Sequence, residues 1–212
     1  MSVRHTPSEE TLLSYAAGAL KTPEAVVVSA HLALCEDSRS WVRTLSYVGG
    51  ELLEALPEED LSGDALARAL ARIDSDGGAV KVAPPVNDMP ELPASLRHLP
   101  LGRWRWLGPG VSARNVLVPA DGASRAFLLK IAPGCKMPQH SHAGSEYTCV
   151  LSGSYEDESG TFGPGDFEEA DEEVDHRPVV NSKDPCICLI ALEGQIQPSG
   201  PFGWLMRPFV RL

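Results

Sequence analysis

The sequence predicts an α + β protein of two domains: a small N-terminal bundle of three to four helices and a C-terminal antiparallel β domain, closed as a barrel or packed as a sandwich. Apolar residues recur at three- and four-residue steps through residues 1–76, which is typical of amphipathic helices. Residues 77–100 are rich in Gly and Pro, which predicts a linker. Residues 101–212 alternate polar and apolar positions between Gly-Pro turns, which predicts many short strands.

Start and stop signals mark the first two predicted helices. Thr6 and Pro7 provide an N-cap and a first-turn proline, and Gly18 is placed to end the first helix. Thr22 and the proline after it repeat the start signal. The second helix then carries an apolar face that runs towards Cys35.

Two further helices are expected before the linker. The third carries apolar residues at helical spacing between Trp41 and Leu52, and the fourth covers residues 62–74. On the fourth helix an apolar stripe is formed by Leu66, Leu70 and Ile73. No neighbouring segment obviously covers this stripe. It either contacts a partner or completes the helical core.

The predicted strands are short and separated by tight turns. A Pro-Gly pair at residues 133–134 and the run Gly163-Pro164-Gly165-Asp166 are the clearest turn signals. The runs with strand-like alternation are Trp104–Trp106, Asn115–Val118, Arg125–Ile131, Tyr147–Leu151 and Cys186–Leu192.

The composition excludes several classes of protein. Among 212 residues, 43% are hydrophobic and 22% are charged, as in a globular protein rather than a disordered or collagen-like one. The formal net charge of −11 argues against direct binding to the phosphate backbone of a nucleic acid. Residues 1–78 hold 6 basic and 13 acidic side chains, which favours a basic partner for the helical part. The 5 cysteines are too few for a secreted disulfide framework, and no export signal or membrane span is expected, so we predict a cytoplasmic protein.

The strongest chemical signal lies in the β domain. His140 and His142 are two residues apart, so on a strand both imidazoles project from one face. Glu146 follows at the start of the next strand, and His176 comes after the predicted turn at residues 163–166. Three imidazoles and one carboxylate suit zinc, iron, manganese or nickel. We therefore expect these four residues to bind a divalent transition metal.

A second group of metal-binding residue types lies in the helical part. His31 and Cys35 are four residues apart, one helical turn, so both can reach a single ion from one face. His5, just ahead of the first helix, is the candidate third ligand. The alternative interpretation of this group is a packed helix end.

Both groups resemble motifs of known families. The spacing Gly-x5-His-x-His-x3-Glu-x6-Gly, from Gly134 to Gly153, resembles the first cupin motif at every defining position, and residues 163–176 resemble the second motif more loosely. The resemblance implies that the β domain is an antiparallel barrel of cupin type. The helical group resembles the zinc-binding anti-sigma motif, a distant histidine followed by His-x3-Cys-x2-Cys. Ser38 stands at the position of its last cysteine, and because a hydroxyl is a poor zinc ligand this predicts a weakened site.

The order of a helical anti-sigma domain, a linker and a cupin domain resembles the ChrR family of anti-sigma factors over nearly the whole chain. The resemblance implies a negative regulator of transcription, not an enzyme, whose helical domain sequesters an extracytoplasmic-function (ECF) sigma factor. It implies that the cupin domain is needed for release in response to singlet oxygen or related peroxides. It also implies Zn²⁺ in the helical domain and Zn²⁺ or another divalent transition metal in the barrel. Leu66, Leu70 and Ile73 are then the expected contacts with the sigma factor.

Two other functions stay open. One is a cupin metalloenzyme of the dioxygenase or isomerase type, with helices that mediate oligomerisation, and the other is a zinc-storage or zinc-sensing module. The sequence contains no nucleophile elbow, phosphate loop or dinucleotide fingerprint. Cys186 and Cys188 face the same side of a predicted strand, where they either sense oxidants or pack as small buried residues.

Overall fold

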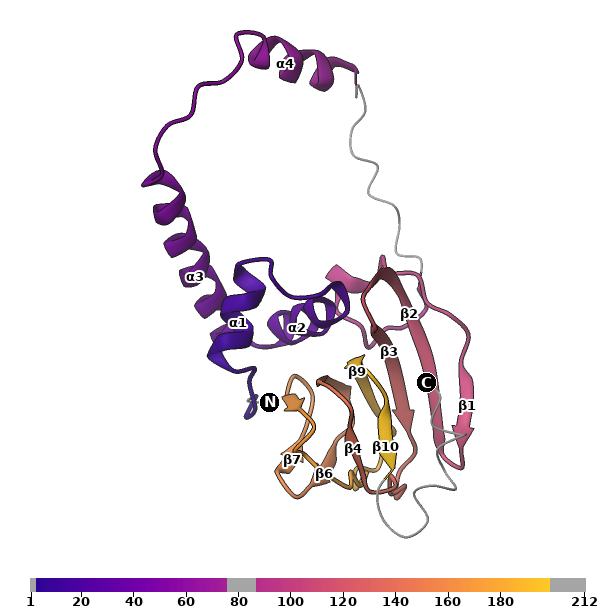
Figure 1. Cartoon of the computed structure of the whole chain (residues 1–212). Coiled ribbons are helices and arrows are strands. Elements are labelled where there is room, and N and C mark those ends of the chain that lie inside the picture. Colours follow the sequence, from indigo (N-terminus) through magenta and orange to yellow (C-terminus); the bar gives the residue numbers. More distant parts are fainter. Residues whose placement is uncertain (1–2, 76–86, 199–212) are drawn as a thin grey trace.

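Four helices and an antiparallel β-barrel make up the part of the chain described by this computed structural model, residues 3–75 and 87–198 (Figure 1), and this confirms the predicted fold class. The helices are α1 (Glu9–Ala16), α2 (Thr22–Leu34), α3 (Glu36–Glu54) and α4 (Ala65–Ser75), with a 3₁₀ turn, η1 (Ala94–Leu96). The strands are β1 (Arg105–Gly108), β2 (Val111–Asp121), β3 (Ser124–Ile131), β4 (His140–His142), β5 (Glu146–Ser152), β6 (Tyr155–Asp157), β7 (Gly160–Phe162), β8 (Phe167–Ala170), β9 (Cys186–Glu193) and β10 (Ile196–Pro198).

Local signals set the helix ends. The cap of α1 is Ser8 and not the predicted Thr6, because the Ser8 hydroxyl accepts a hydrogen bond from the Thr11 N–H at 3.2 Å. After α1 the chain turns at Gly18, whose φ of +67° is the left-handed conformation that favours glycine. Pro23 lies in the first turn of α2, as predicted.

Six strands form the main sheet in the order β1-β2-β3-β9-β5-β8, and every neighbouring pair is antiparallel. The pairs β10-β4 and β6-β7 form two smaller sheets. The central strand β9 is buried along nearly its whole length, and its side chains alternate between two apolar clusters. Leu189 packs towards the helices, whereas Ile190 packs into the barrel.

The helices pack on the outer face of this sheet. Val27 and Val28 of α2 are fully buried in one cluster with Leu128 of β3 and Leu189 of β9. The same cluster contains Met89, Leu92 and Leu96, which lie in the stretch predicted as a linker. The helices and the barrel therefore share a hydrophobic core, and part of the 77–100 stretch packs into it. The division into ranges 1–76, 77–100 and 101–212 stays a prediction.

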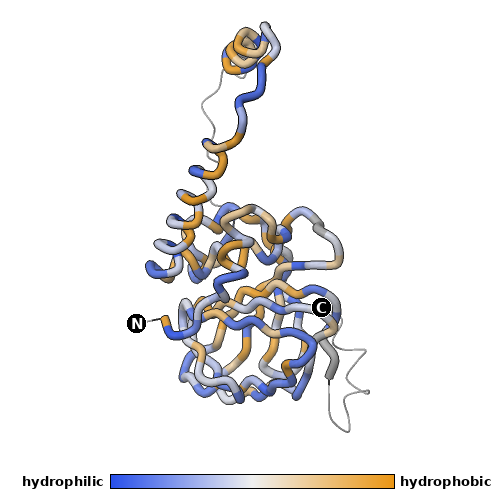
Figure 2. Tube along the Cα trace, turned by 60° about the vertical axis from the view of Figure 1, so that its left-hand side comes forward, coloured by the Kyte–Doolittle hydropathy of each residue, from blue (hydrophilic) through white to orange (hydrophobic). Residues whose placement is uncertain are grey.

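We call residues 3–75 the helical head. Its last two helices extend away from the shared core, with α3 pointing outward and α4 at its far end (Figures 1 and 2). Ser38 is the one buried residue of α3, and no residue of α4 is buried. None of the helices in the described ranges has the length and hydropathy that a membrane span requires.

Candidate metal centre and the contact between head and barrel

The barrel encloses a cavity of about 370 Å³. Most of its wall is apolar, with side chains such as Phe127 and Ile190. Three of the predicted metal ligands, His140, Glu146 and His176, line the same cavity, and all three are buried. The cavity thus combines an apolar wall with a cluster of groups able to bind a metal.

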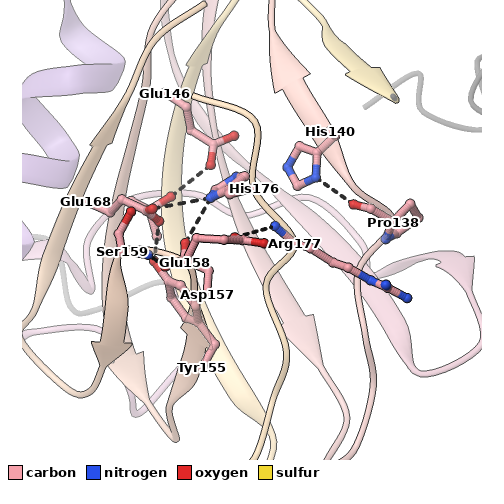
Figure 3. Close-up of polar contacts among 11 residues, drawn as sticks. Pro138, His140, Glu146, Tyr155, Asp157, Glu158, Ser159, Glu168, His176 and Arg177 are labelled. Atoms are coloured by element: carbon pink, nitrogen blue, oxygen red, sulfur yellow. Dashed lines mark hydrogen bonds and ion pairs between the residues drawn. The ribbon is translucent and has the colours of Figure 1, made fainter. Parts of the chain in front are cut away.

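His176 is the centre of this cluster (Figure 3). Its Nδ1 lies 3.1 Å from Oδ2 of Asp157 on β6 and 3.3 Å from Oε1 of Glu168 on β8. Among the side chains that the structure describes, these three residues form the one set of three His, Cys, Asp or Glu ligand atoms that lie within 4.8 Å of one another. The Tyr155 hydroxyl donates a hydrogen bond to the other oxygen of Glu168 and holds that carboxylate in place.

The charges of these groups depend on one another. Burial alone would lower the pKa of His176, but its hydrogen bonds to Asp157 and Glu168, together with the charges of Glu168 and Glu146, raise that pKa to about 10. Burial raises the pKa of Glu168, whereas the pKa of Asp157 is lowered because its hydrogen bond from His176 helps to outweigh the effect of burial. The two carboxylates therefore create a position in the barrel that favours positive charge.

His140 and Glu146 lie beside this set. His140 is on β4, its ring centroid is 4.7 Å from that of His176, and its Nδ1 lies 2.8 Å from the carbonyl oxygen of Pro138. The carbonyl oxygen accepts, so Nδ1 carries the proton and Nε2 is the ring nitrogen that would coordinate a metal, as is common for metal-binding histidines. Glu146 begins β5 and accepts a hydrogen bond from the Thr148 hydroxyl at 3.1 Å. His142 also belongs to β4, but its side chain lies outside the described residues.

The nitrogen and oxygen donors present here fit a divalent transition metal. Two of them, Asp157 and Glu168, were not predicted from the sequence. The signal that would have found them is alternation along a strand. Asp157 lies two residues after the buried Tyr155, and Glu168 lies two residues before the buried Ala170, so each shares a face with a buried residue.

Two thiols lie next to the cavity. Cys186 and Cys188 of β9 are both buried, and their Sγ atoms are 3.6 Å apart, on one face of the strand as expected. Cys188 lines the cavity. The contact with Cys186 and the burial of the thiol raise the pKa of Cys188, so it is held as a thiol.

Each predicted zinc ligand of the head has its own contacts in the structure. His31 of α2 is fully buried: its Nδ1 lies 2.7 Å from the carbonyl oxygen of Gly165, and its Nε2 lies 2.8 Å from the hydroxyl oxygen of Ser38. Burial lowers the pKa of His31, more than its contacts with Gly165 and Asp166 raise it. Cys35 is buried between α2 and α3. The zinc site of His5, His31 and Cys35 stays a prediction.

His5 is fixed to the barrel. Its ring packs against Phe162 of β7 with the ring centroids 4.3 Å apart. Its backbone N–H donates to Asp166 at 3.0 Å, and its carbonyl accepts from the N–H of Phe167 at 3.0 Å. The start of the chain therefore runs along the beginning of β8.

The loop before β8 joins the head to the barrel. Asp166 is buried and accepts from the N–H groups of Arg4 and His5 with one oxygen and from Gly163 with the other. Gly165 is required for the close approach, because its φ is +91° and a Cβ there would lie 2.8 Å from Val3 and 3.3 Å from the Cβ of Leu34. Outside this loop, Tyr147 with Thr11 and Ser124 with Glu24 form further hydrogen bonds between barrel and head.

Comparison with known proteins matches both parts of the chain. Residues 98–196 match the family model described as the ChrR cupin-like domain. The curated anti-sigma-E factor ChrR of Cereibacter sphaeroides is 38% identical over 217 residues, and the match covers 100% of each chain. The crystal structure of Rhodobacter sphaeroides SigE in complex with the anti-sigma ChrR contains a similar chain, with a TM-score of 0.76 and 38% identity. That match covers 91% of this chain and 100% of the other.

Proposed function

The chain belongs to the ChrR family of anti-sigma factors, and on this premise we propose that it is a negative regulator of transcription that sequesters an ECF sigma factor. The helical head binds the sigma factor and so blocks its access to RNA polymerase core. An oxidant, singlet oxygen or a peroxide, acts on the barrel and causes release. Because transcription initiation is cytoplasmic, we place the protein in the cytoplasm.

The observation that carries this proposal is the exposed apolar surface of α3 and α4. Leu66, Leu70 and Ile73 are 72%, 52% and 69% exposed, so in the described chain they do not complete a helical core. On α3, Leu52 and Leu53 are exposed too. We call the exposed apolar residues of α3, of α4 and of the segment between them the docking surface, which consists of Tyr47, Val48, Leu52, Leu53, Leu56, Leu61, Leu66, Leu70 and Ile73.

The position of the docking surface suits a protein partner. Scattered exposed apolar residues are ordinary, but a continuous series along two helices marks an interaction site. α3 and α4 stand away from the barrel, so both are accessible to a second protein (Figure 2). Helices that present apolar residues at this spacing commonly bind in hydrophobic grooves of a partner.

The charge around the docking surface favours a basic partner. Between α3 and α4 the chain carries Glu58, Glu59, Asp60 and Asp64, and the exposed Glu51 and Glu54 lie at the end of α3. A sigma factor is basic where it meets promoter DNA. An acidic rim around an apolar surface accelerates association with such a partner and aligns it.

Strand β8 provides the contact through which the barrel reaches the head. Successive side chains of a strand face opposite sides. Glu168 faces the cavity and contacts His176, whereas Phe167 packs edge-on against His31 of α2, with ring centroids 5.5 Å apart. A change at the metal centre that moves Glu168 therefore displaces the residues that hold α2. Release of a bound sigma factor requires a loss of roughly 1–3 kcal/mol in affinity, an ordinary coupling free energy.

In the barrel we propose Zn²⁺ or another divalent transition metal, held by His140, His142, Glu146 and His176, with Asp157 and Glu168 next to the site. A bound metal would fix β4, β5 and the His176 segment relative to one another and lower the pKa of bound water. Groups open to oxidation, the imidazoles and the thiol of Cys188, lie around the same cavity.

The alternative of a cupin metalloenzyme with an oligomerisation appendage is not favoured, because the match to an anti-sigma factor extends over the helical head as well as the barrel. We therefore propose that the barrel regulates binding and does not catalyse a reaction. A zinc-storage or zinc-sensing module would release its partner on loss of metal alone. Oxidant added at constant metal content distinguishes this module from the proposed regulator, because only the regulator should then release its partner.

The test is co-expression of the full-length chain with each ECF sigma factor of its own genome, followed by affinity purification. The full chain is required because α2 shares its core with the barrel. We expect one sigma factor to co-purify, to be inactive in promoter-dependent transcription, and to be released by singlet oxygen or a peroxide. If no sigma factor is bound or silenced while the protein converts a small molecule catalytically, the proposal is wrong.

A further inference from the structure

We propose that the helical head of this chain is held together without a metal ion, and that a hydrogen bond between His31 and Ser38 joins α2 to α3 at the place where the anti-sigma motif has an ion. His31 lies in the last turn of α2, and Ser38 lies in the first turn of α3. The contact between them crosses the bend that separates the two helices at Cys35.

The expected zinc ligands of the head do not come together. His5, His31 and Cys35 all belong to the described residues, yet the one set of three ligand atoms within 4.8 Å in those residues is the set in the barrel. The fourth position of the motif is a serine. A neutral hydroxyl does not replace the charge and softness that a thiolate offers to zinc.

Both ring nitrogens of His31 have hydrogen-bond partners. The carbonyl oxygen of Gly165, 2.7 Å from Nδ1, is an acceptor, so Nδ1 carries the proton. In the neutral ring Nε2 then has the lone pair and accepts from the hydroxyl of Ser38 at 2.8 Å. A metal would need this same lone pair. The hydroxyl proton thus takes the place of the ion, and both polar atoms are satisfied in a fully buried position.

His5 is held against the barrel. Its ring packs on Phe162, and both of its backbone polar groups bond to residues 166 and 167. The residue expected as the distant ligand therefore fastens the start of the chain to the barrel. It contributes to the contact between head and barrel in place of a metal site in the head.

If the protein releases a sigma factor in response to an oxidant, as proposed above, a metal-free head restricts how the oxidant can act. Cys35 is the one cysteine of residues 1–76, so the head cannot close an internal disulfide. A switch in which oxidation joins two thiols and ejects their metal is therefore excluded in the head. A disulfide-based signal would therefore have to form in the barrel, which holds the other four cysteines.

Metal analysis of the full-length chain tests the inference and needs no sigma factor. The untagged protein is purified from zinc-supplemented cells, and its zinc content is measured by inductively coupled plasma mass spectrometry. We expect about one zinc per chain for the wild type and about two for Ser38→Cys, which restores the thiolate donor. About two in the wild type would overturn the inference. No zinc in the wild type would support a metal-free head and contradict Zn²⁺ as the metal of the barrel.

Cobalt substitution identifies the site without any change to the barrel ligands. Only a head site would bind Co²⁺ through the Cys35 thiolate, which gives an intense thiolate-to-cobalt charge-transfer band, whereas the ligands proposed for the barrel are nitrogen and oxygen atoms. We expect no such band in the wild type and a strong one in Ser38→Cys. A wild-type band that disappears in Cys35→Ser would refute the metal-free head. A Ser38→Cys variant that binds zinc at the wild-type level and has no band would refute the assignment of Ser38 as the replacement for the ion.

Discussion

Truncation of Leu66 and Leu70 to alanine separates a docking role for α4 from a structural one. Complete burial of a leucine side chain contributes about 1.5–3 kcal/mol. The two residues are 72% and 52% exposed in the free chain, so burial of these fractions against a sigma factor would contribute roughly 1–2 kcal/mol each. After allowance for the β carbon that alanine keeps, the double variant should lose about 2–3 kcal/mol of binding, which raises Kd by about 30- to 150-fold.

Two measurements on the full-length protein check this expectation. Kd for the co-purified sigma factor is measured by isothermal titration calorimetry, and the free energy of unfolding of the anti-sigma chain alone is measured in urea. Because no residue of α4 is buried and alanine favours helix, the free energy of unfolding of the double variant should differ from that of the wild type by no more than about 0.5 kcal/mol. Arg68→Gln is the matched control, since Arg68 is two positions from both leucines and so on the opposite side of the helix. An unchanged Kd, or a large loss of stability in the free chain, would refute the docking role.

Three further variants test the contact between head and barrel and the metal centre. Ser38→Ala leaves a buried imidazole nitrogen without its donor and should lower the free energy of unfolding by about 1–3 kcal/mol in urea; no change would mean that the hydrogen bond is dispensable. Asp166→Ala removes the acceptor of three backbone N–H groups and should lower the free energy of unfolding by about 2–5 kcal/mol. The control Glu172→Ala, at an exposed position, should lower it by less than about 0.5 kcal/mol. Equal effects of the two variants would contradict the anchoring role of Asp166. Glu168→Gln removes a negative charge beside His176 and should weaken zinc binding, measured in competition with a chelator, about 10- to 100-fold. The control Glu173→Gln, at an exposed position, should leave the zinc affinity unchanged. The same zinc affinity in both variants would mean that Glu168 does not contribute to metal binding.

The elements were predictable from the sequence because their signals are local. Helical periodicity and caps located α1 to α4, and alternation located the long strands β3, β5 and β9, because side chains on one face of each element must meet the core. The N-cap of α1 was misplaced because two residues with suitable hydroxyls, Thr6 and Ser8, lie close together. Which of them caps depends on the Ser8–Glu169 contact with the barrel, a long-range feature.

The assembly of the site was less predictable. The motif from His140 to Glu146 was evident because its ligands are close in the sequence. Asp157 and Glu168 come from two different strands and meet at His176 only through the sheet topology. The packing of α2 on the main sheet was likewise absent from the prediction, because an apolar face shows that a helix is buried without showing against which element.

The hydrophobic core that the head and the barrel share affects how a signal in the barrel could reach the head. If a loose linker joined two separate domains, a signal in the barrel would have to alter a binding surface on a distant body. Here residues 165–168 touch both sites: Gly165 and Phe167 contact His31, Asp166 fixes the start of the chain, and Glu168 contacts His176. Because neighbouring residues of a packed segment do not shift independently, we expect a displacement of Glu168 to move the contacts of α2. Under the proposed function, α3 would then follow through the His31–Ser38 hydrogen bond, and residues 165–168 would carry the signal from the candidate metal centre towards the docking surface.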